Sequence, residues 1–317
     1  GKRGYRIMEL SLLLAEQILA MFLIMAVGFF IVKIGLFQES DGKVLSNLVV
    51  YICSPCVIVD SFQIEMTDDK IKGLLLAVIA AIFVHIVMLA GTWILNHIFH
   101  FNSIEKASII YTNAGYLIIP LVGAVLGSEW VFYTTAFILV QTVLMWTHCM
   151  CLISESRQND WKKILFNPNI VAMLLGLLLF LFRVQLPDVI ASCVSGFGQM
   201  ISPASMLVIG MAIGNVDLKW VFTQKRPYLI CFFRLIVYPI LGVIGFGILG
   251  QMGIHPDAEY ILMVVLLATA APAAAMVTQL AQLYNKDVKY ASVINVMSVI
   301  FCIVTMPVMV MLYEMFY

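Results

Sequence analysis

The stretch "NAGYLIIP", residues 113–120, lies in the middle of a long apolar segment. It places an amide side chain, a glycine and a proline where a chain that crosses lipid tolerates them least. Pro120 lacks the backbone N–H that a helix needs, and its ring clashes with the preceding turn. Backbone groups freed in this way are tolerated at membrane depth only where protein or a water-filled cavity satisfies them. The stretch therefore predicts an interrupted membrane helix beside a polar cavity.

The composition around this stretch is that of a membrane protein. Of the 317 residues, 62% are hydrophobic and 11% are charged, against about 45–50% and about 25% in soluble domains. The 18 basic and 18 acidic residues cancel, so no net charge recruits nucleic acid. The seven cysteines show no metal-ligand spacing. We therefore expect no cofactor, no metal and no disulfide.

Apolar segments of membrane-spanning length recur along the whole chain. A helix needs about 20 apolar residues to cross the hydrocarbon core. The sequence predicts an all-α polytopic membrane protein in contact with lipid, with ten transmembrane helices at about 10–32, 44–63, 73–96, 107–127, 130–154, 166–184, 189–213, 227–250, 259–283 and 290–313.

The connections between these segments carry an asymmetric charge. One set holds eleven Lys and Arg residues and the other holds six, half of them in the first seven residues. Cytoplasmic loops carry the excess of basic residues. We therefore expect the first set in the cytoplasm, with both termini outside the cytoplasmic (plasma) membrane. The longest polar connection, "SESRQNDWKK" at 154–163, would then be cytoplasmic.

The two halves of the chain show a weak internal repeat. "ICSP" at 52–55 and "MISP" at 200–203 are offset by 148 residues, and Pro120 and Pro272 by 152. Five spans in each half give the halves opposite orientations, as in an inverted repeat. The expected division is a first five-helix repeat at 1–154, a cytoplasmic linker at 155–165 and a second repeat at 166–317.

The ninth segment is interrupted like the fourth. It reads "LLATAAPAAAMVTQLAQLYN", with Pro272 among small residues. Two breaks at corresponding positions predict one shared cavity. Broken helices place half-helix N-termini, with their positive dipole ends, near the midplane, where they receive an anionic group. The alternative is that the two prolines only kink packed helices.

Several of these motifs resemble one known family. "NAGYLIIP" is similar to the asparagine-x-x-x-x-glycine-x-proline crossover of the auxin efflux carrier family, which includes plant auxin exporters and bacterial permeases assigned to malate or related acids. Ile118 stands where that motif usually has Gly. The resemblance covers nearly all the chain, with further matches at "RLIVYP" (234–239), "AAPAAAMVTQLAQLYN" (270–285) and "ASVINVMSVIFCIVTMP" (291–307).

The resemblance implies an architecture and a mechanism. It implies two inverted five-helix repeats with broken helices four and nine. Spans one, two, six and seven would be a scaffold, and the other six a moving transport domain of the elevator type. The implied cargo is a small organic anion, a carboxylate such as malate or an auxin-like acid. A homodimer through the scaffold helices is left open.

Candidate substrate-binding residues cluster at the two breaks, and each has a structural alternative. Asn113 could contact the anion or satisfy freed backbone. Ala273 and Ala274 leave their amides accessible, or simply pack closely. Gln141 and Asn295 could line the cavity or form interhelical hydrogen bonds. The full set is Asn113, Gly115, Pro120, Gln141, Pro272, Ala273, Ala274 and Asn295.

Four ionisable residues are candidates for charged support or coupling. Arg234 is the one Arg or Lys predicted near the middle of a span, about two turns from its cytoplasmic end. We expect an ion-pair or gating role there, too far out to serve a midplane site. His85, 149 residues earlier, fits a neutral core histidine or a proton carrier. Asp60 and Glu16, near span boundaries, could carry a coupling proton or be interfacial. For His148 the sequence indicates no partner.

Three other functional classes compete with a simple carrier. A sodium- or proton-coupled symporter of the bile-acid-transporter type would need a carboxylate-rich cation site beside the crossovers. A non-transporting, ligand-sensing membrane protein would be expected to carry a signalling domain. An intramembrane hydrolase needs a buried catalytic pair, and Asp60 has no second carboxylate in a span interior. We therefore expect no enzyme and no catalytic residues.

Overall fold

The computed structural model describes residues 2–156 and 161–317. Within these residues the regular elements are helices, and one isolated antiparallel bridge joins Thr112 to Ala273. The predicted all-α class is confirmed. Residues 157–160 of the predicted linker at 155–165 lie outside the described residues.

The first half of the chain contains eight α-helices and five shorter helical segments. The α-helices are α1 (Lys2–Lys33), α2 (Gly42–Leu48), α3 (Ser54–Ser61), α4 (Asp68–Phe99), α5 (Ser103–Ile110), α6 (Ile119–Val125), α7 (Val131–Leu144) and α8 (Met150–Ser154). Three π-helical segments lie among them, η2 (Val49–Cys53), η3 (Ala114–Ile118) and η5 (Met145–Cys149), with 3-10 turns η1 (Glu39–Asp41) and η4 (Ser128–Trp130).

The second half contains ten α-helices and one π-helical segment, η6 (Phe233–Val237), among the described residues. The α-helices are α9 (Trp161–Leu165), α10 (Pro168–Leu181), α11 (Asp188–Gln199), α12 (Ile201–Ala212), α13 (Leu218–Thr223), α14 (Arg226–Phe232), α15 (Tyr238–Gln251), α16 (Ala258–Thr269), α17 (Ala275–Leu283) and α18 (Val288–Phe316).

Six described helical segments are long and apolar enough to cross a membrane. They are Glu39–Ser61, Asp68–Phe99, Ser128–Ser154, Asp188–Ala212, Arg226–Gln251 and Val288–Phe316. Three shorter helices are also apolar, Leu19–Lys33, Pro168–Leu181 and Ala258–Thr269. The fourth predicted span, 107–127, is divided among α5, η3 and α6. An interrupted span cannot contain an unbroken helix of full length, which is one reason why the sequence predicts more spans than the length criterion finds.

Several helix ends follow from capping residues. The Asn102 side chain accepts from the Glu105 N–H, while the Glu105 carboxylate accepts from the Asn102 N–H, which forms a capping box at the start of α5. The Asn167 and Asp217 side chains accept from the first-turn amides of α10 and α13. These polar residues fix where the apolar helices begin.

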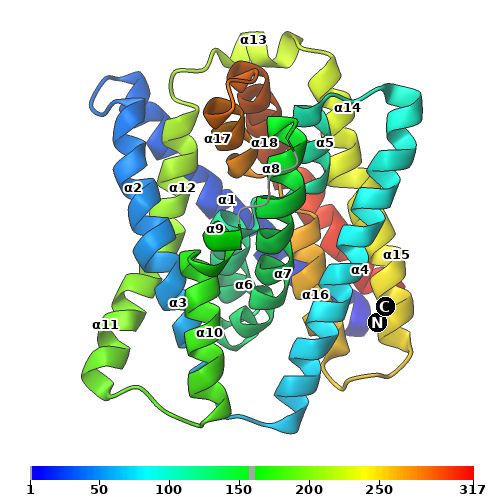
Figure 1. The fold of residues 1–317 in the computed structure, drawn as a ribbon. Coiled ribbons are helices and arrows are strands. Elements are labelled where there is room, and N and C mark those ends of the chain that lie inside the picture. The colour runs from blue at the N-terminus through cyan, green and yellow to red at the C-terminus, as the bar shows by residue number, and fades with distance from the viewer. Residues whose placement is uncertain (1, 157–160) are drawn as a thin grey trace.

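The helices pack in two groups. In the first, α1 packs along α12, α2 also contacts α12, and α3 packs between α10 and α11. In the second, α4 contacts α7 and α16, α15 contacts α16 and α18, and α17 contacts α18. Figure 1 shows α2, α3, α11 and α12 on one side and α4, α15 and α16 on the other. The groups meet where α1 contacts α18 and η3 contacts α12.

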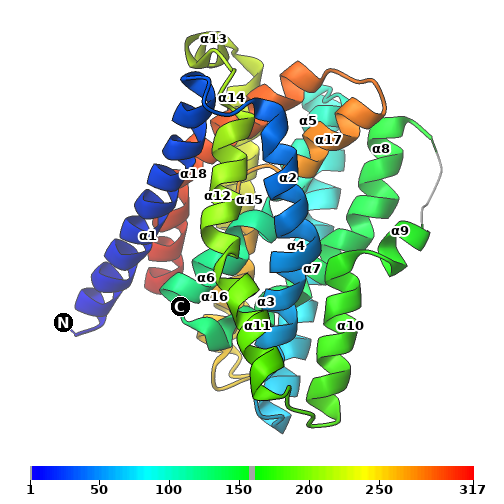
Figure 2. The same cartoon turned by 90° about the vertical axis from the view of Figure 1, so that its left-hand side faces the viewer.

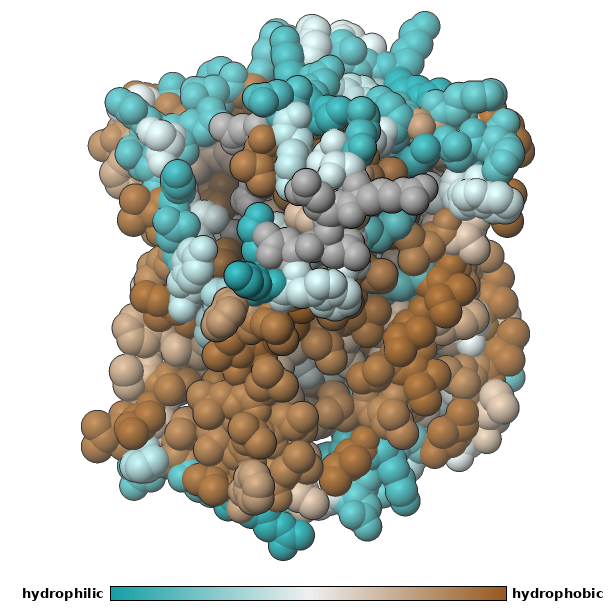
Figure 3. Space-filling model, in the orientation of Figure 1, coloured by the Kyte–Doolittle hydropathy of each residue, from teal (hydrophilic) through white to brown (hydrophobic). Residues whose placement is uncertain are grey.

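The surface carries an apolar belt between two polar ends. Figure 3 shows the hydrophobic band, with the more extensive hydrophilic cap at the end that holds α13. That end includes Lys219 in α13, Arg226 at the start of α14, Lys286 between α17 and α18, and Lys289 in the first turn of α18. The two ends of the chain lie toward the opposite side (Figure 1, Figure 2). This distribution is that of a multi-pass membrane protein.

Candidate functional site

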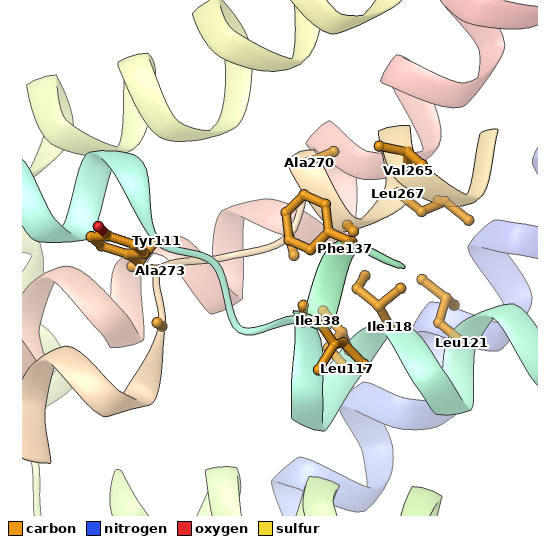
Figure 4. Packing of buried hydrophobic residues seen from close by; sticks show 14 of the residues in the cluster. Tyr111, Leu117, Ile118, Leu121, Phe137, Ile138, Val265, Leu267, Ala270 and Ala273 are labelled. Carbon is orange, nitrogen blue, oxygen red and sulfur yellow. The ribbon is translucent and has the colours of Figure 1, made fainter. Parts of the chain in front are cut away.

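The two interrupted helices cross each other as extended chains. α5 ends at Ile110 and α16 ends at Thr269, and an antiparallel bridge pairs Thr112 with Ala273. The Asn113 N–H donates to the Pro272 carbonyl at 2.8 Å, and the Ala274 N–H donates to the Tyr111 carbonyl at 3.0 Å. Figure 4 shows Tyr111 beside Ala273 at this crossing. Backbone groups that two broken helices leave unpaired thus satisfy each other at membrane depth.

An amide side chain holds each strand of the crossover. Gln141 on α7 accepts from the Thr112 N–H at 2.9 Å and donates to the Thr112 carbonyl at 2.8 Å. Asn295 on α18 donates to the Ala273 carbonyl at 2.9 Å, and Ser298 accepts from the Ala273 N–H at 3.0 Å. Gln141 and Asn295 therefore make interhelical hydrogen bonds, one of the two predicted alternatives, at corresponding places in the two halves.

Arg234 lies at the crossover, where its charge meets the C-terminal ends of both half-helices. It is fully buried and donates to the carbonyls of Ile109 at 2.6 Å and Ile110 at 3.0 Å, and also to that of Thr269. These carbonyls carry the negative ends of the α5 and α16 dipoles. The expectation that Arg234 lies too near the cytoplasmic end is wrong. The π-helical turn η6 carries it, and its long side chain reaches the carbonyls beside the crossing.

The N-terminal ends of the other two half-helices lie on the far side of the crossing. η3 begins at Ala114 and α17 begins at Ala275. First-turn amides have no intrahelical acceptor, and Asn113 at the N-cap of η3 makes no side-chain capping bond. The Asn113 side chain is 4% exposed, and its Nδ2 has no hydrogen-bond partner among residues 2–156 and 161–317. A Cβ on Gly115 would meet nothing within 4 Å. This end of the crossover has donors to offer a ligand.

A cavity of about 140 Å³ adjoins the start of α17. One wall is the aliphatic face of α12, and the other is formed by α17 and α18. The residues that line the cavity are Val208, Ile209, Ala212, Ile213, Ala275, Thr278, Ser292, Asn295 and Val296. Of the sequence candidates, Asn295 lines this cavity directly. The cavity is neutral, aliphatic on one side, and has hydroxyl and amide groups on the other.

The two candidate prolines do not occupy equivalent places. Pro272 is at the crossing and its carbonyl accepts the Asn113 N–H. Pro120 is buried near the start of α6, after the π-helical turn η3. The prediction that Pro120 marks the break is wrong, because the helix breaks at residues 111–113 and Pro120 lies further on, where the π-helical turn η3 runs directly into α6. The residue opposite Ala273 is Thr112.

The remaining ionisable candidates lie apart from the crossing. Glu16 on α1 and Asp60 on α3 are exposed. His85 on α4 is buried, hydrogen-bonds the Ala81 carbonyl through Nδ1 at 2.7 Å, and lies 4.7 Å from the Phe137 ring between centroids. Its other ring nitrogen has no partner among the described residues. His85 is therefore a buried, hydrogen-bonded core histidine.

A buried carboxylate joins the two halves at the α13 end. Glu105 accepts from Arg226 Nε at 2.9 Å and from the Tyr290 hydroxyl at 2.6 Å. Burial alone would raise the pKa of the Glu105 carboxyl, but the hydrogen bonds from Arg226 and Tyr290 outweigh it, and the pKa lies below its ordinary value. Arg226 also donates to the Phe99 carbonyl at the end of α4 at 2.7 Å.

Sequence reasoning missed four residues of the crossover network. They are Tyr111, Thr112, His148 and Ser298. His148 has a partner after all, because its Nδ1 lies 2.8 Å from the Tyr111 hydroxyl. Arg234 and His148 both lie in π-helical segments, which are rare and occur often at functional sites. Thr112 and Ser298 could have been found from the sequence as polar residues close to the candidates Asn113 and Asn295.

Comparison with known proteins agrees with this geometry. The family model described as "Membrane transport protein" matches residues 13–160 and 155–310. A protein described as an uncharacterized transporter, from Methanocaldococcus jannaschii, is 22% identical over 286 residues, which cover 86% of this chain and 90% of that one. The chain is a transport protein and not an enzyme. It belongs to the membrane transport protein family that includes the auxin efflux carriers.

Proposed function

We propose that this protein is a secondary transporter that moves a small organic anion across the cytoplasmic membrane by elevator-type alternating access. The observation that carries the proposal is the neutral cavity beside the start of α17, between α12 and the crossover. A half-helix N-terminus attracts an anion without a buried cation. Arg234 is fully buried, but it is bonded to carbonyls at the opposite helix ends.

The two walls of the cavity suit a carboxylate with an apolar part. Thr278, Ser292 and Asn295 offer hydroxyl and amide groups to oxygen atoms, while Val208 and Ile209 offer aliphatic surface. Such a site binds weakly, because a helix terminus contributes about 0.3–1 kcal/mol when exposed and up to about 2 kcal/mol when partly buried. We expect affinities on the order of micromolar to millimolar. Carboxylates such as malate or an auxin-like acid remain the proposed cargo.

The same proposal includes the arrangement of the halves. The group of α1, α2, α3, α10, α11 and α12 would be the scaffold, and the crossover with its surrounding helices would move against it. Ten spans in two inverted repeats fit the matching clamps by Gln141 and Asn295 on the two crossover strands. The basic α13 end would be cytoplasmic and both termini outside. Labelling of a single Cys at Ser156 from outside intact cells would contradict this orientation.

Uptake into proteoliposomes tests the proposal. Purified protein would be assayed with radiolabelled malate and indole-3-acetate, with and without imposed proton or sodium gradients. Ala212→Trp fills the cavity from the α12 side and should abolish saturable uptake. Leu178→Trp, on an α10 position that is 52% exposed, is the matched control and should transport normally. Equal uptake by the Ala212→Trp variant and the wild type would rule out this cavity as the site.

A further inference from the structure

The Tyr111 side chain connects the crossover to a titratable residue outside it. Tyr111 is fully buried, and its backbone carbonyl accepts the Ala274 N–H that holds the two crossover strands together. Its hydroxyl lies 2.8 Å from His148 Nδ1 and 3.3 Å from the Leu144 carbonyl oxygen. The Tyr111 side chain therefore links His148 to the backbone pairing of the crossover.

The geometry accommodates two protonation states of His148. A tyrosine hydroxyl has one proton to donate and can also accept. When Nδ1 is bare, the hydroxyl donates to it, and the Leu144 carbonyl receives no hydrogen bond from Tyr111. When Nδ1 carries a proton, as it does in one neutral tautomer and always does in the doubly protonated ring, Nδ1–H donates to the Tyr111 oxygen, and the hydroxyl proton turns to the Leu144 carbonyl. Both short contacts are then hydrogen bonds, and Tyr111 is held from two sides.

His148 also lies at the surface of the protein. It is an exposed residue of the π-helical segment η5. Its neighbours contribute few ionisable groups. α17, which packs on α8, has none in its sequence, and Lys163 on α9 lies 5.4 Å from the Trp146 ring centroid. The titratable and charged groups on the elements around η5 are Tyr111, Cys149, Cys151, Lys162 and Lys163, with Tyr133 at the far end of α7, Glu105 and Lys106 at the far end of α5 and the Glu155–Lys286 ion pair beyond α8.

His85 and His97 lack this combination of exposure and contact. His85 is buried, and its Nδ1 lies 2.7 Å from the Ala81 carbonyl, within its own helix. His97 is exposed, and its Nδ1 lies 2.9 Å from the Trp93 carbonyl, within its own helix. His148 alone among these three contacts a residue of the crossover.

We propose that His148 is a proton-binding site coupled through Tyr111 to the crossover, so that a proton and the anion bind cooperatively. The inference rests on the proposed carrier function and adds its coupling ion. A positive charge on η5 attracts an anion at the crossover, and the second hydrogen bond to Tyr111 stabilises the paired strands. By linkage, a proton that favours the anion is itself favoured by the anion. Histidine changes charge between about pH 5 and 8, the range in which such coupling would operate.

The proton site can be measured without transport. The protein has five histidines, and ¹⁵N-histidine labelling in lipid nanodiscs, with His148→Gln to assign the signal, follows the His148 ring across pH 5–8. We expect a titration whose midpoint moves in Tyr111→Phe, which removes the hydroxyl and keeps the ring. A His148 signal that does not titrate, or that titrates identically in Tyr111→Phe, would overturn the proposal.

The coupling is tested by the pH dependence of uptake. Lowering the pH from 7.5 to 6 should lower the half-saturation concentration of the wild type for the transported carboxylate, by about fivefold or more. His148→Gln should be insensitive, and the exposed control His97→Gln should behave as wild type with the same substrate. An unchanged pH dependence in His148→Gln would refute the coupling. If the wild type takes up neither probe, the carrier function fails, while the nanodisc titration still decides the proton site.

Discussion

Replacing Arg234 with Met should destabilise the protein strongly, because it removes the only charge at the C-terminal ends of two half-helices among the described residues. Met keeps an unbranched, mostly apolar side chain but leaves the carbonyls of Ile109, Ile110 and Thr269 without their donor. A buried unsatisfied group costs about 1–3 kcal/mol. Three such groups, partly relieved by local relaxation, give an expected loss of at least about 3 kcal/mol. Removal of the buried guanidinium recovers some desolvation energy. The negative dipole ends of α5 and α16, however, are then left without a counter-charge.

The assay is unfolding in mixed micelles of a mild detergent and dodecyl sulfate, followed by tryptophan fluorescence. Arg234→Lys restores a charge with three donors but cannot reproduce the planar fork that reaches both helix ends. Its stability should therefore lie between those of Arg234→Met and the wild type. Arg234→Met within about 0.5 kcal/mol of the wild type, the range of ordinary surface substitutions, would refute the account of Arg234 as the counter-charge of the crossover.

Three further predictions follow from local contacts. Folding lowers the pKa of Glu105. The stability that the Glu105 carboxylate adds is therefore complete at pH values above its ordinary pKa of 4.5 and is lost as the pH falls through the folded-state pKa. Glu105→Gln should flatten the acid side of a stability–pH profile. A Cβ on Gly210 would overlap the Met25 carbonyl, so Gly210→Val should separate α1 from α12 and lower the thermal unfolding midpoint by several degrees. Ser298→Ala leaves the Ala273 N–H unpaired and should cost about 1–3 kcal/mol, measured as above; no change would show that water replaces the hydroxyl.

The sequence predicted the features of the fold that depend on local composition. Apolar runs located the helical segments, and the Asn113 and Pro272 neighbourhoods located the interruptions. The sequence placed the first break about two turns away from its actual position. An interruption by proline can be recognised in a sequence, whereas an interruption in a segment that contains no proline cannot. The chain leaves the helix at residues 111–113 because Thr112 and Asn113 pair with the second break, a contact between residues about 160 positions apart.

The network around the crossover was less predictable. The reach of Arg234 depends on a π-helical turn, and hydropathy gives no signal for that. His148 and Tyr111 are 37 residues apart, and only the packing of α5 against α8 brings them together. Gln141 and Asn295 were identified as polar residues inside spans, but whether such an amide contacts backbone or ligand depends on which unpaired group lies opposite.

The half-saturation concentration for carboxylate uptake by Asn113→Ala tests the anion site most directly. The Asn113 Nδ2 is buried and has no partner within the described residues. Replacing Asn113 with Ala therefore leaves no protein group unsatisfied and should leave the unfolding midpoint nearly unchanged. Loss of one hydrogen bond to a charged ligand, about 1.5–3 kcal/mol, predicts a half-saturation concentration about 10- to 100-fold higher in proteoliposomes. Saturable uptake by Asn113→Ala at the wild-type half-saturation concentration would contradict an anion site at the N-terminal side of the crossover.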